Sequence, residues 1–559
     1  MRRPVSLVLA LLTFSACAPE PDVDVVLRGG TLYDGSGDPG YVGDVAIQGD
    51  SIVAVGDVGD LRGATELDVT GMAVSPGFIN MLSWATEPLL VDGTGESDLR
   101  QGVTLEVFGE GESMGPLNDA MKADMVRFQG DLKFDVAWTT LGEYLEHLER
   151  SGVAMNVASY IGATTVRIHE LGYEDRAPSD EELARMQELV RQAMQEGALG
   201  VGSSLIYAPA FYAETPELIA LVQAAAEFQG AYISHMRSEG NRLLESVDEL
   251  VEIARATGAP AEIYHLKAAG QANWAKMDEV IRKVEEARVQ GLRVTADMYT
   301  YTAGATGLDA AMPPWVQEGG YDAWAERMKD PAVRARVVRE MRTPTDEWEN
   351  LLLAAGSPDR VLLTGFKADS LKHLTGKTLA EVAALYGASP EDVAIDLVIK
   401  DGSRVATVYF MMDEENLKKQ VKLPWVSFGS DAGALATREP FTLSSTHPRA
   451  YGNFARVLDT YVREERALTL QEAIRKMSAL PAANLKLRRR GLLQAGYHAD
   501  VVVFDPTTVT DHATFELPHQ YATGVKHVFV NGAHALADGE PTGAKAGRVV
   551  RGPGWTGWK

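Results

Sequence analysis

The chain has 559 residues, too many for one small domain, and its hydrophobic content of 45% excludes a disordered protein. Its 53 basic and 78 acidic residues give a net charge of -25, which argues against a nucleic-acid partner. We therefore expect one large α/β domain accompanied by at least one smaller domain.

The first 17 residues resemble a bacterial lipoprotein signal peptide. Arg2 and Arg3 precede an apolar run too short to span a bilayer, and Phe14-Ser15-Ala16-Cys17 resembles a lipobox. The resemblance implies lipidation of Cys17 and an envelope location, at the outer membrane facing the periplasm, because Ala18 rather than aspartate follows. An ordinary secretion signal is the alternative. Cys17 is the only cysteine, so the sequence offers neither a disulfide nor a catalytic thiol.

Short strands separated by tight turns occupy both ends of the rest of the chain. They include residues 25–27 and 52–55 near the start, and residues 501–504 and 525–530 near the end. Neither set is large enough to be stable alone. We therefore predict one small β-sandwich built from residues 23–74 and 488–552, flanking a central domain of residues 75–487.

Helices and strands alternate regularly in the central domain. Successive helical stretches lead to strands that end near Ser203, His235, His265 and Asp297, and the last two intervals are 30 and 32 residues. Such units predict a parallel sheet, and polar residues at so many strand ends favour a closed (β/α)8 barrel over a doubly wound sheet. Residues from about 303 to 422 break the pattern and are predicted to be an inserted lid segment. The last strand then ends at Asp431.

Two of these strand ends carry histidines that are candidate metal ligands. Ile233-Ser234-His235 and Ile263-Tyr264-His265 place two imidazoles at the same rim of the sheet. A single strand-end histidine is usually a satisfied polar group, whereas two in register are also a natural pair of metal ligands.

Further motifs occur across nearly the whole mature chain, and they include Ser75-Pro76-Gly77-Phe78-Ile79, Ser234-His235-Met236-Arg237, Gly429-Ser430-Asp431 and His447-Pro448-Arg449. Together with the strand ends, these motifs resemble the amidohydrolase superfamily, and within it the D-aminoacylases (N-acyl-D-amino-acid deacylases). The resemblance implies a metal-dependent hydrolase of linear amides that uses one Zn²⁺ ion. It further implies that His235 and His265 hold this ion, and that Asp431 lies beside it as a ligand and as general base and acid.

The sequence departs from the family pattern in two places. The superfamily's first strand normally ends in His-X-His, but here the equivalent residues are Leu82-Ser83-Trp84, none of which is an ordinary zinc ligand, so we expect one metal position to be missing. The family's cysteine ligand is also absent. Glu110 aligns with it and is the expected replacement, with Glu112 as the alternative. A carboxylate would also accept divalent metals other than zinc.

The resemblance also implies a substrate site. Lys267, Tyr299 and Arg449 match family residues that bind the substrate's α-carboxylate, although surface charge is the alternative for the two cations. Trp84 is a candidate for the acyl pocket, but packing in the core or lid is the preferred interpretation. The expected function is deacylation of N-acyl-D-amino acids. The alternatives are a non-catalytic ligand-binding relative, or an amidohydrolase acting on another amide, a cyclic imide, a lactone or a dipeptide.

Overall fold

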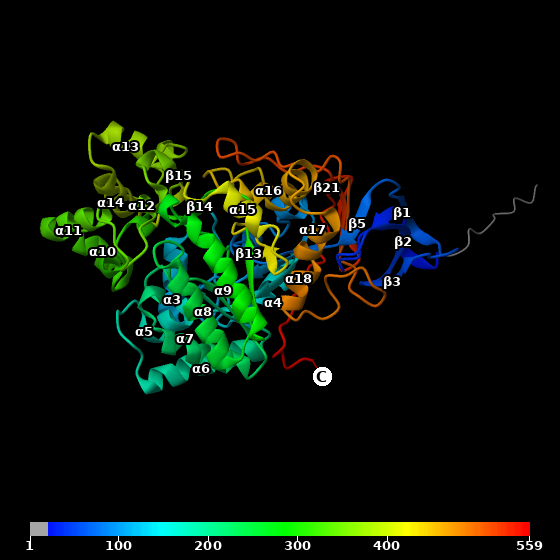
Figure 1. Ribbon diagram of the computed structural model, residues 1–559, viewed down its shortest axis with the longest axis horizontal. Helices are drawn as coiled ribbons and strands as arrows, with labels where there is room; N and C mark the ends of the chain where they lie inside the picture. The colour runs from blue at the N-terminus through cyan, green and yellow to red at the C-terminus, as the bar shows by residue number, and fades with distance from the viewer. Residues whose placement is uncertain (1–20, 559) are drawn as a thin grey trace, which may run out of the picture.

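The computed structural model describes residues 21–558, so Cys17 and the predicted signal peptide lie outside the described residues. A β domain lies at one end of the molecule, a barrel in the middle, and an inserted helical segment at the other end (Figure 1). None of the helices in residues 21–558 has the length and apolar character needed to cross a bilayer.

The central domain is a closed barrel of parallel strands. One set of strands runs in the order β6-β7-β8, and β9 follows β8 directly and continues the order as β9-β10-β11-β12-β13-β17. Between the first and last strands, Met81 N–H donates to Phe428 O (3.2 Å) and Ser83 bridges to Ala432, which closes the circle. Counting β8 and β9 as one strand, the barrel has eight, and the predicted (β/α)8 class is confirmed. The strands are β6 (Phe78–Asn80), β7 (Val103–Phe108), β8 (Asn156–Ser159), β9 (Ile161–Gly162), β10 (Gly200–Ser204), β11 (Ala231–His235), β12 (Ala261–Ile263), β13 (Val294–Met298) and β17 (Val426–Phe428).

The helices that cover the barrel follow from local sequence signals. Ser179 and Glu182 form a capping box at the start of α6 (Asp180–Gln195), and α8 (Leu243–Thr257) ends at Gly258, which has a φ of 69°. Their apolar faces pack on strands whose residues are almost all buried, as expected for a parallel sheet covered by helices. The other covering helices are α1 (Pro88–Val91), α2 (Glu96–Leu99), α3 (Asp119–Phe128), α4 (Leu141–Ser151), α5 (Ala163–Leu171), α7 (Thr215–Ala226), α9 (Met277–Val289), α16 (Arg449–Arg456), α17 (Leu470–Met477) and α18 (Ala479–Asn484).

Both chain ends contribute strands to the β domain, as predicted. Its nine-stranded sheet is joined where β5 pairs antiparallel with β18, so strands more than 400 residues apart share one ladder. Along β1, Val25 and Leu27 belong to one apolar cluster while Val23 and Val26 belong to another, so both faces of this strand are covered. The strands are β1 (Val23–Leu32), β2 (Tyr41–Gln48), β3 (Ser51–Gly56), β4 (Gly63–Asp68), β5 (Ala73–Pro76), β18 (Val501–Phe504), β19 (Val525–Val530), β20 (Ala533–Ala537) and β21 (Glu540–Pro541).

The end of the segment that we assigned to the β domain packs elsewhere. Val157 N–H donates to Arg548 O (3.0 Å), and Gly552 N–H donates to Gly197 O (2.8 Å). Residues 547–552 therefore run along the barrel. Their backbone groups form hydrogen bonds with barrel backbone groups that would otherwise have no partner.

The inserted segment has its own small sheet. Strand β16 (Ala406–Tyr409) lies between β14 (Gly304–Gly307) and β15 (Val361–Gly365), and both of its neighbours are antiparallel to it. Figure 1 shows the associated helices projecting away from the β domain. They are α10 (Gly320–Arg327), α11 (Pro331–Met341), α12 (Leu351–Ala355), α13 (Leu379–Tyr386) and α14 (Pro390–Asp401), and α15 (Glu414–Gln420) leads back to the barrel.

Candidate active site

A cavity of about 960 Å³ lies where the carboxyl ends of the barrel strands meet the inserted segment. The barrel contributes Glu110, His235, His265 and Asp431 to its wall, and the insertion contributes residues such as Arg404. All the site residues that we predicted within the described chain line this cavity.

Glu110 and the two histidines form a compact cluster at the base of the cavity. Glu110 Oε1 lies 2.8 Å from His265 Nε2 and 3.1 Å from His235 Nδ1. Within residues 21–558, these three side chains are the one group of at least three His, Cys, Asp or Glu residues arranged to hold a metal ion. Glu112 also lines the cavity but is outside this group, as is Asp431.

The backbone around the cluster explains how each side chain reaches it. Glu110 lies between Gly109 and Gly111, whose φ values are 109° and 70°. A side chain at Gly109 would approach Tyr160 O to 2.5 Å, so this turn requires glycine. His265 has a φ of 35°, a strained value for a non-glycine residue, and its N–H donates to Asp297 Oδ1 (2.9 Å). The loops are therefore built to direct Glu110 and His265 into the cavity.

The buried carboxylates around the cluster favour positive charge on its imidazoles. Burial and the neighbouring Lys267 act to lower the pKa of His265, but Glu239 and Glu110 outweigh them and raise it to about 10. Burial acts to raise the pKa of Glu110, but His265 and His235 hold that pKa well below its usual range. Such a cluster favours a bound cation. The cation is either a proton on an imidazole or a metal ion that replaces this proton.

Asp431 lies beside the cluster and has two partners of its own. Its Oδ2 is 2.8 Å from Arg449 Nη1, and its Oδ1 accepts from Trp84 Nε1 (3.2 Å). Burial raises the pKa of Asp431, against the opposing charge of Arg449. The φ of Asp431 is 50°, and its N–H donates to Leu82 O (2.8 Å), which ties it to the end of the first strand.

The three predicted carboxylate-binding residues lie together. The Arg449 guanidinium is 4.3 Å from the centre of the Tyr299 ring, and Lys267 Nζ is 5.6 Å from the same centre. Lys267 is buried, and its Nζ lies 2.6 Å from Glu239 Oε1 and 2.7 Å from His265 Nδ1. The surface-charge alternative therefore does not describe either cation.

Sequence reasoning did not identify Glu239 as a neighbour of the cluster, and it favoured a packing role for Trp84. Glu239 contacts His265 Nδ1 (3.0 Å) and His235 Nε2 (3.5 Å), and the only available signal was its spacing of four residues from His235. Trp84, which we expected to be packing, is 38% exposed, and its indole donates to Glu110 Oε2 (2.9 Å).

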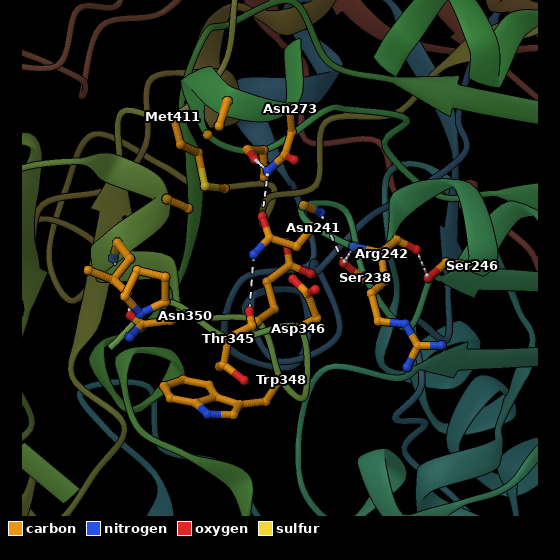
Figure 2. Close-up of a pocket in the computed structure, with 18 of the residues that line it drawn as sticks. Ser238, Asn241, Arg242, Ser246, Asn273, Thr345, Asp346, Trp348, Asn350 and Met411 are labelled. Carbon is orange, nitrogen blue, oxygen red and sulfur yellow. Dashed lines mark hydrogen bonds between the residues drawn. The ribbon is translucent and has the colours of Figure 1, made fainter. Parts of the chain in front are cut away.

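A second cavity, of about 890 Å³, lies behind Glu239. Figure 2 shows Asn241 between Asn273 and Thr345, with hydrogen bonds of 3.3 Å to Asn273 Nδ2 and 3.0 Å to Thr345 O. Glu349 lines this second cavity, and its Oε2 accepts from the backbone N–H of Glu239 (2.7 Å), which lines the main cavity. Glu349 therefore supports the loop that carries Glu239.

The opposite side of the main cavity is formed by the insertion. Arg404 lies 4.7 Å from the centre of the Tyr207 ring, and its Nε donates to Asp309 (3.0 Å). Tyr207 in turn contacts His235 edge to face, with the ring centres 5.3 Å apart. Arg404 of the insertion therefore contacts the Tyr207 ring, and this ring contacts His235 of the cluster.

Residues 65–534 match the family model for the amidohydrolase family. A D-aminoacylase from Alcaligenes xylosoxydans xylosoxydans is 34% identical over 531 residues, which are 94% of this chain and 97% of that protein. A solved D-aminoacylase, described as having a binuclear metal centre with one-metal activation and second-metal attenuation, is 32% identical with a TM-score of 0.78. An N-acyl-D-glutamate deacylase from Bordetella bronchiseptica, solved with zinc and a phosphonate mimic of the tetrahedral intermediate, is 29% identical with a TM-score of 0.76. Each superposition covers 95% of this chain and 100% of the other chain.

Proposed function

Because this chain belongs to the amidohydrolase family, we propose that it hydrolyses the amide bond of N-acyl-D-amino acids with the help of one zinc ion. The single observation that carries the proposal is the cluster of Glu110, His235 and His265, with Asp431 and Arg449 next to it in one cavity. The names of the similar proteins support the substrate class, since they are deacylases of N-acyl-D-amino acids.

The donor set fits zinc. Two imidazoles and one carboxylate form a known catalytic combination, and His235 Nε2 is buried without a hydrogen-bond partner. His235, His265 and Glu110 would hold the ion, and a carboxylate in place of cysteine also suits other divalent metals. When bound, the ion polarises the amide carbonyl and makes a water molecule a better nucleophile.

Asp431 performs the proton transfers. Its carboxylate accepts a proton from the attacking water and then delivers a proton to the amide nitrogen as the C–N bond breaks. Its position supports this role, because Arg449 and Trp84 fix its two oxygens while the side chain still faces the cavity. Contact with a cation and an N–H keeps the carboxylate oriented without making it a member of the metal cluster.

Arg449 is the principal anchor for the α-carboxylate of the substrate. Its guanidinium lines the cavity and offers several donors in a fixed plane. Lys267 already contacts Glu239 and His265, so it uses its remaining N–H for the substrate while holding the Glu239 carboxylate in place. Tyr299 contacts both cations through its ring.

The amidase activity is tested with a panel of N-acetyl-D- and N-acetyl-L-amino acids, followed by release of the free amino acid. We expect turnover of D substrates that is lost on metal removal and restored by zinc. Release from L substrates alone, or no release with any divalent ion, would contradict the proposal. Hydrolysis of cyclic imides, lactones or dipeptides in preference to these substrates would replace it with another amidohydrolase activity.

We also propose that the protein is held in the cell envelope through a lipid on Cys17, at the outer membrane and facing the periplasm. The basic, apolar and lipobox-like order of residues 1–17 supports this location. A Cys17→Ser variant is expected to leave the membrane fraction, and its retention there would contradict the proposal.

A further inference from the structure

The end of the first barrel strand fixes Trp84 against the last strand. Trp84 N–H donates to Ala432 O (2.9 Å), and Ser83 bridges to Ala432. Asp431 N–H returns a hydrogen bond to Leu82 O (2.8 Å). These backbone bonds set the position of the indole relative to Asp431 before any side-chain contact is counted.

The indole N–H lies between two carboxylates of the site. Trp84 Nε1 is 2.9 Å from Glu110 Oε2 and 3.2 Å from Asp431 Oδ1. The other oxygen of Glu110 faces both histidines, at 2.8 Å and 3.1 Å. The two oxygens of Glu110 therefore have different partners: Oε1 contacts the histidines and Oε2 contacts the indole.

We propose that Trp84 is a positioning residue that takes the place of a second metal ion and keeps the site mononuclear. The proposal rests on the proposed function, and it concerns how this chain completes the site after losing the first-strand histidines. An indole N–H is only a donor, so it satisfies two carboxylates but cannot bind a cation. The indole N–H also lies within hydrogen-bond distance of both Glu110 Oε2 and Asp431 Oδ1, so it occupies the two oxygens that could otherwise share a second ion.

Holding Glu110 Oε2 also has a consequence for the first ion. Because one oxygen is already bonded, the carboxylate presents Oε1 to the histidines in a single orientation. Partners of this kind around a metal ligand typically contribute about 10- to 100-fold in metal affinity. Trp84 thus prevents the binding of a second metal ion and strengthens the binding of the first.

The test measures zinc content and affinity for the wild type, Trp84→Phe and Trp84→His, by elemental analysis and calorimetry of the metal-stripped full chain. Phenylalanine keeps an aromatic ring but removes the N–H, so we expect one equivalent of zinc bound about 10-fold more weakly. Histidine supplies a nitrogen ligand, so we expect a second equivalent to bind. Trp558→Phe is the matched control, because Trp558 is similarly exposed (37%) and donates its Nε1 to Gly552 O far from the cavity.

The outcomes separate this inference from the proposed function. Two equivalents in the wild type, or wild-type affinity in Trp84→Phe, would overturn the role of Trp84 and leave the amidase proposal standing. One equivalent with weakened binding in Trp84→Phe would support the role of Trp84 even if no N-acyl-D-amino acid were hydrolysed. A thermal melt of each variant shows that the comparison is made between folded proteins, and a wild type that binds no metal would overturn both proposals.

Discussion

Strands β6 and β11 lead to the same cavity but present opposite chemistry to it. Beyond β6 the side chain is the indole of Trp84, a neutral donor that contacts two carboxylates. At the end of β11 it is the imidazole of His235, whose Nδ1 lies 3.1 Å from Glu110 Oε1 and whose Nε2 lies 3.5 Å from Glu239 Oε2. One strand end supplies a hydrogen bond and the other supplies a ring nitrogen that can bind a metal ion.

The difference shows how two strand ends of unlike chemistry can share one carboxylate. Glu110 connects the two sides, because its Oε1 faces the histidines while its Oε2 faces the indole. A carboxylate has two oxygens, so Glu110 can contact the histidines with one and the indole with the other. Glu110 and Trp84 are therefore two parts of one arrangement.

The largest effect on activity is expected from substituting a histidine of the metal cluster. His265→Asn should remove the bound zinc and lower kcat/KM by about a thousand-fold, since the ion contributes several kcal/mol to transition-state stabilisation. His534→Asn, in the β domain, is the control and should retain both zinc and activity. Retention of full activity by His265→Asn would contradict the metal assignment.

Asp431 lies next to Trp84, and its substitution tests proton transfer apart from metal binding. Asp431→Asn keeps the shape and should lower kcat by about 100- to 10,000-fold. Zinc content should stay at one equivalent, because Asp431 is outside the three-residue cluster. Loss of zinc in this variant would instead make Asp431 a ligand.

Glu110 contacts both strand ends, and its neighbour Glu112 provides a matched control. Glu110→Gln should weaken zinc binding by about 100-fold or more, because loss of a ligand exceeds the loss of an outer partner. Glu112→Gln removes a carboxyl group from the same loop that lines the cavity but is exposed and lies outside the metal cluster, so it should leave zinc affinity nearly unchanged. Calorimetric titration of both variants measures the difference, and a larger effect at Glu112 would reverse the assignment.

A smaller effect is expected at the substrate anchor. Arg449→Met removes a charged hydrogen-bond donor worth about 2 kcal/mol, so KM for an N-acyl-D-amino acid should rise about 30-fold. The same variant assayed with the corresponding amino-acid amide, which has no carboxylate, should show little change in KM. An equal rise for both substrates would mean that Arg449 acts only through Asp431.

The smallest effect, on thermal stability, is expected from Glu262 in the barrel interior. Burial raises the pKa of Glu262 to about 7, although Thr295, Ser427 and Asn484 donate hydrogen bonds that oppose the shift. The folded state therefore holds a proton that the unfolded state releases near pH 4.5, so stability falls as pH rises from about 4.5 through 7. Glu262→Gln cannot titrate, and the decrease in Tm between pH 5 and pH 8 should be about 2 °C smaller than in the wild type. An identical decrease would place this titration elsewhere.

The regular features of the molecule were predictable from sequence because they follow from periodicity. Repeated helix–strand units predicted the barrel, and a strand end at each of His235, His265 and Asp431 predicted their common cavity. The joint β domain of the two chain ends was also predictable, since neither end could form a stable sheet alone, whereas the particular pairing of β5 with β18 was not.

The remaining features depend on contacts between distant segments, which no local pattern encodes. Trp84 and Asp431 are 347 positions apart in the chain, and their hydrogen bond exists only because the first and last strands close the barrel. Residues 547–552 pack on the barrel for a similar reason, since their partner Val157 is about 390 positions away. Glu239 carried a weak signal, its spacing from His235, but that spacing alone does not indicate a contact with His265.

One titration tests the central claim, a mononuclear site for amide hydrolysis, most directly. Metal-stripped wild-type protein is titrated with zinc while release of the amino acid from an N-acetyl-D-amino acid is followed. The arrangement around Trp84 predicts that activity rises to one equivalent and then stays level through a large excess of zinc. A further rise to two equivalents, a decline beyond one equivalent or the absence of activity throughout would contradict it.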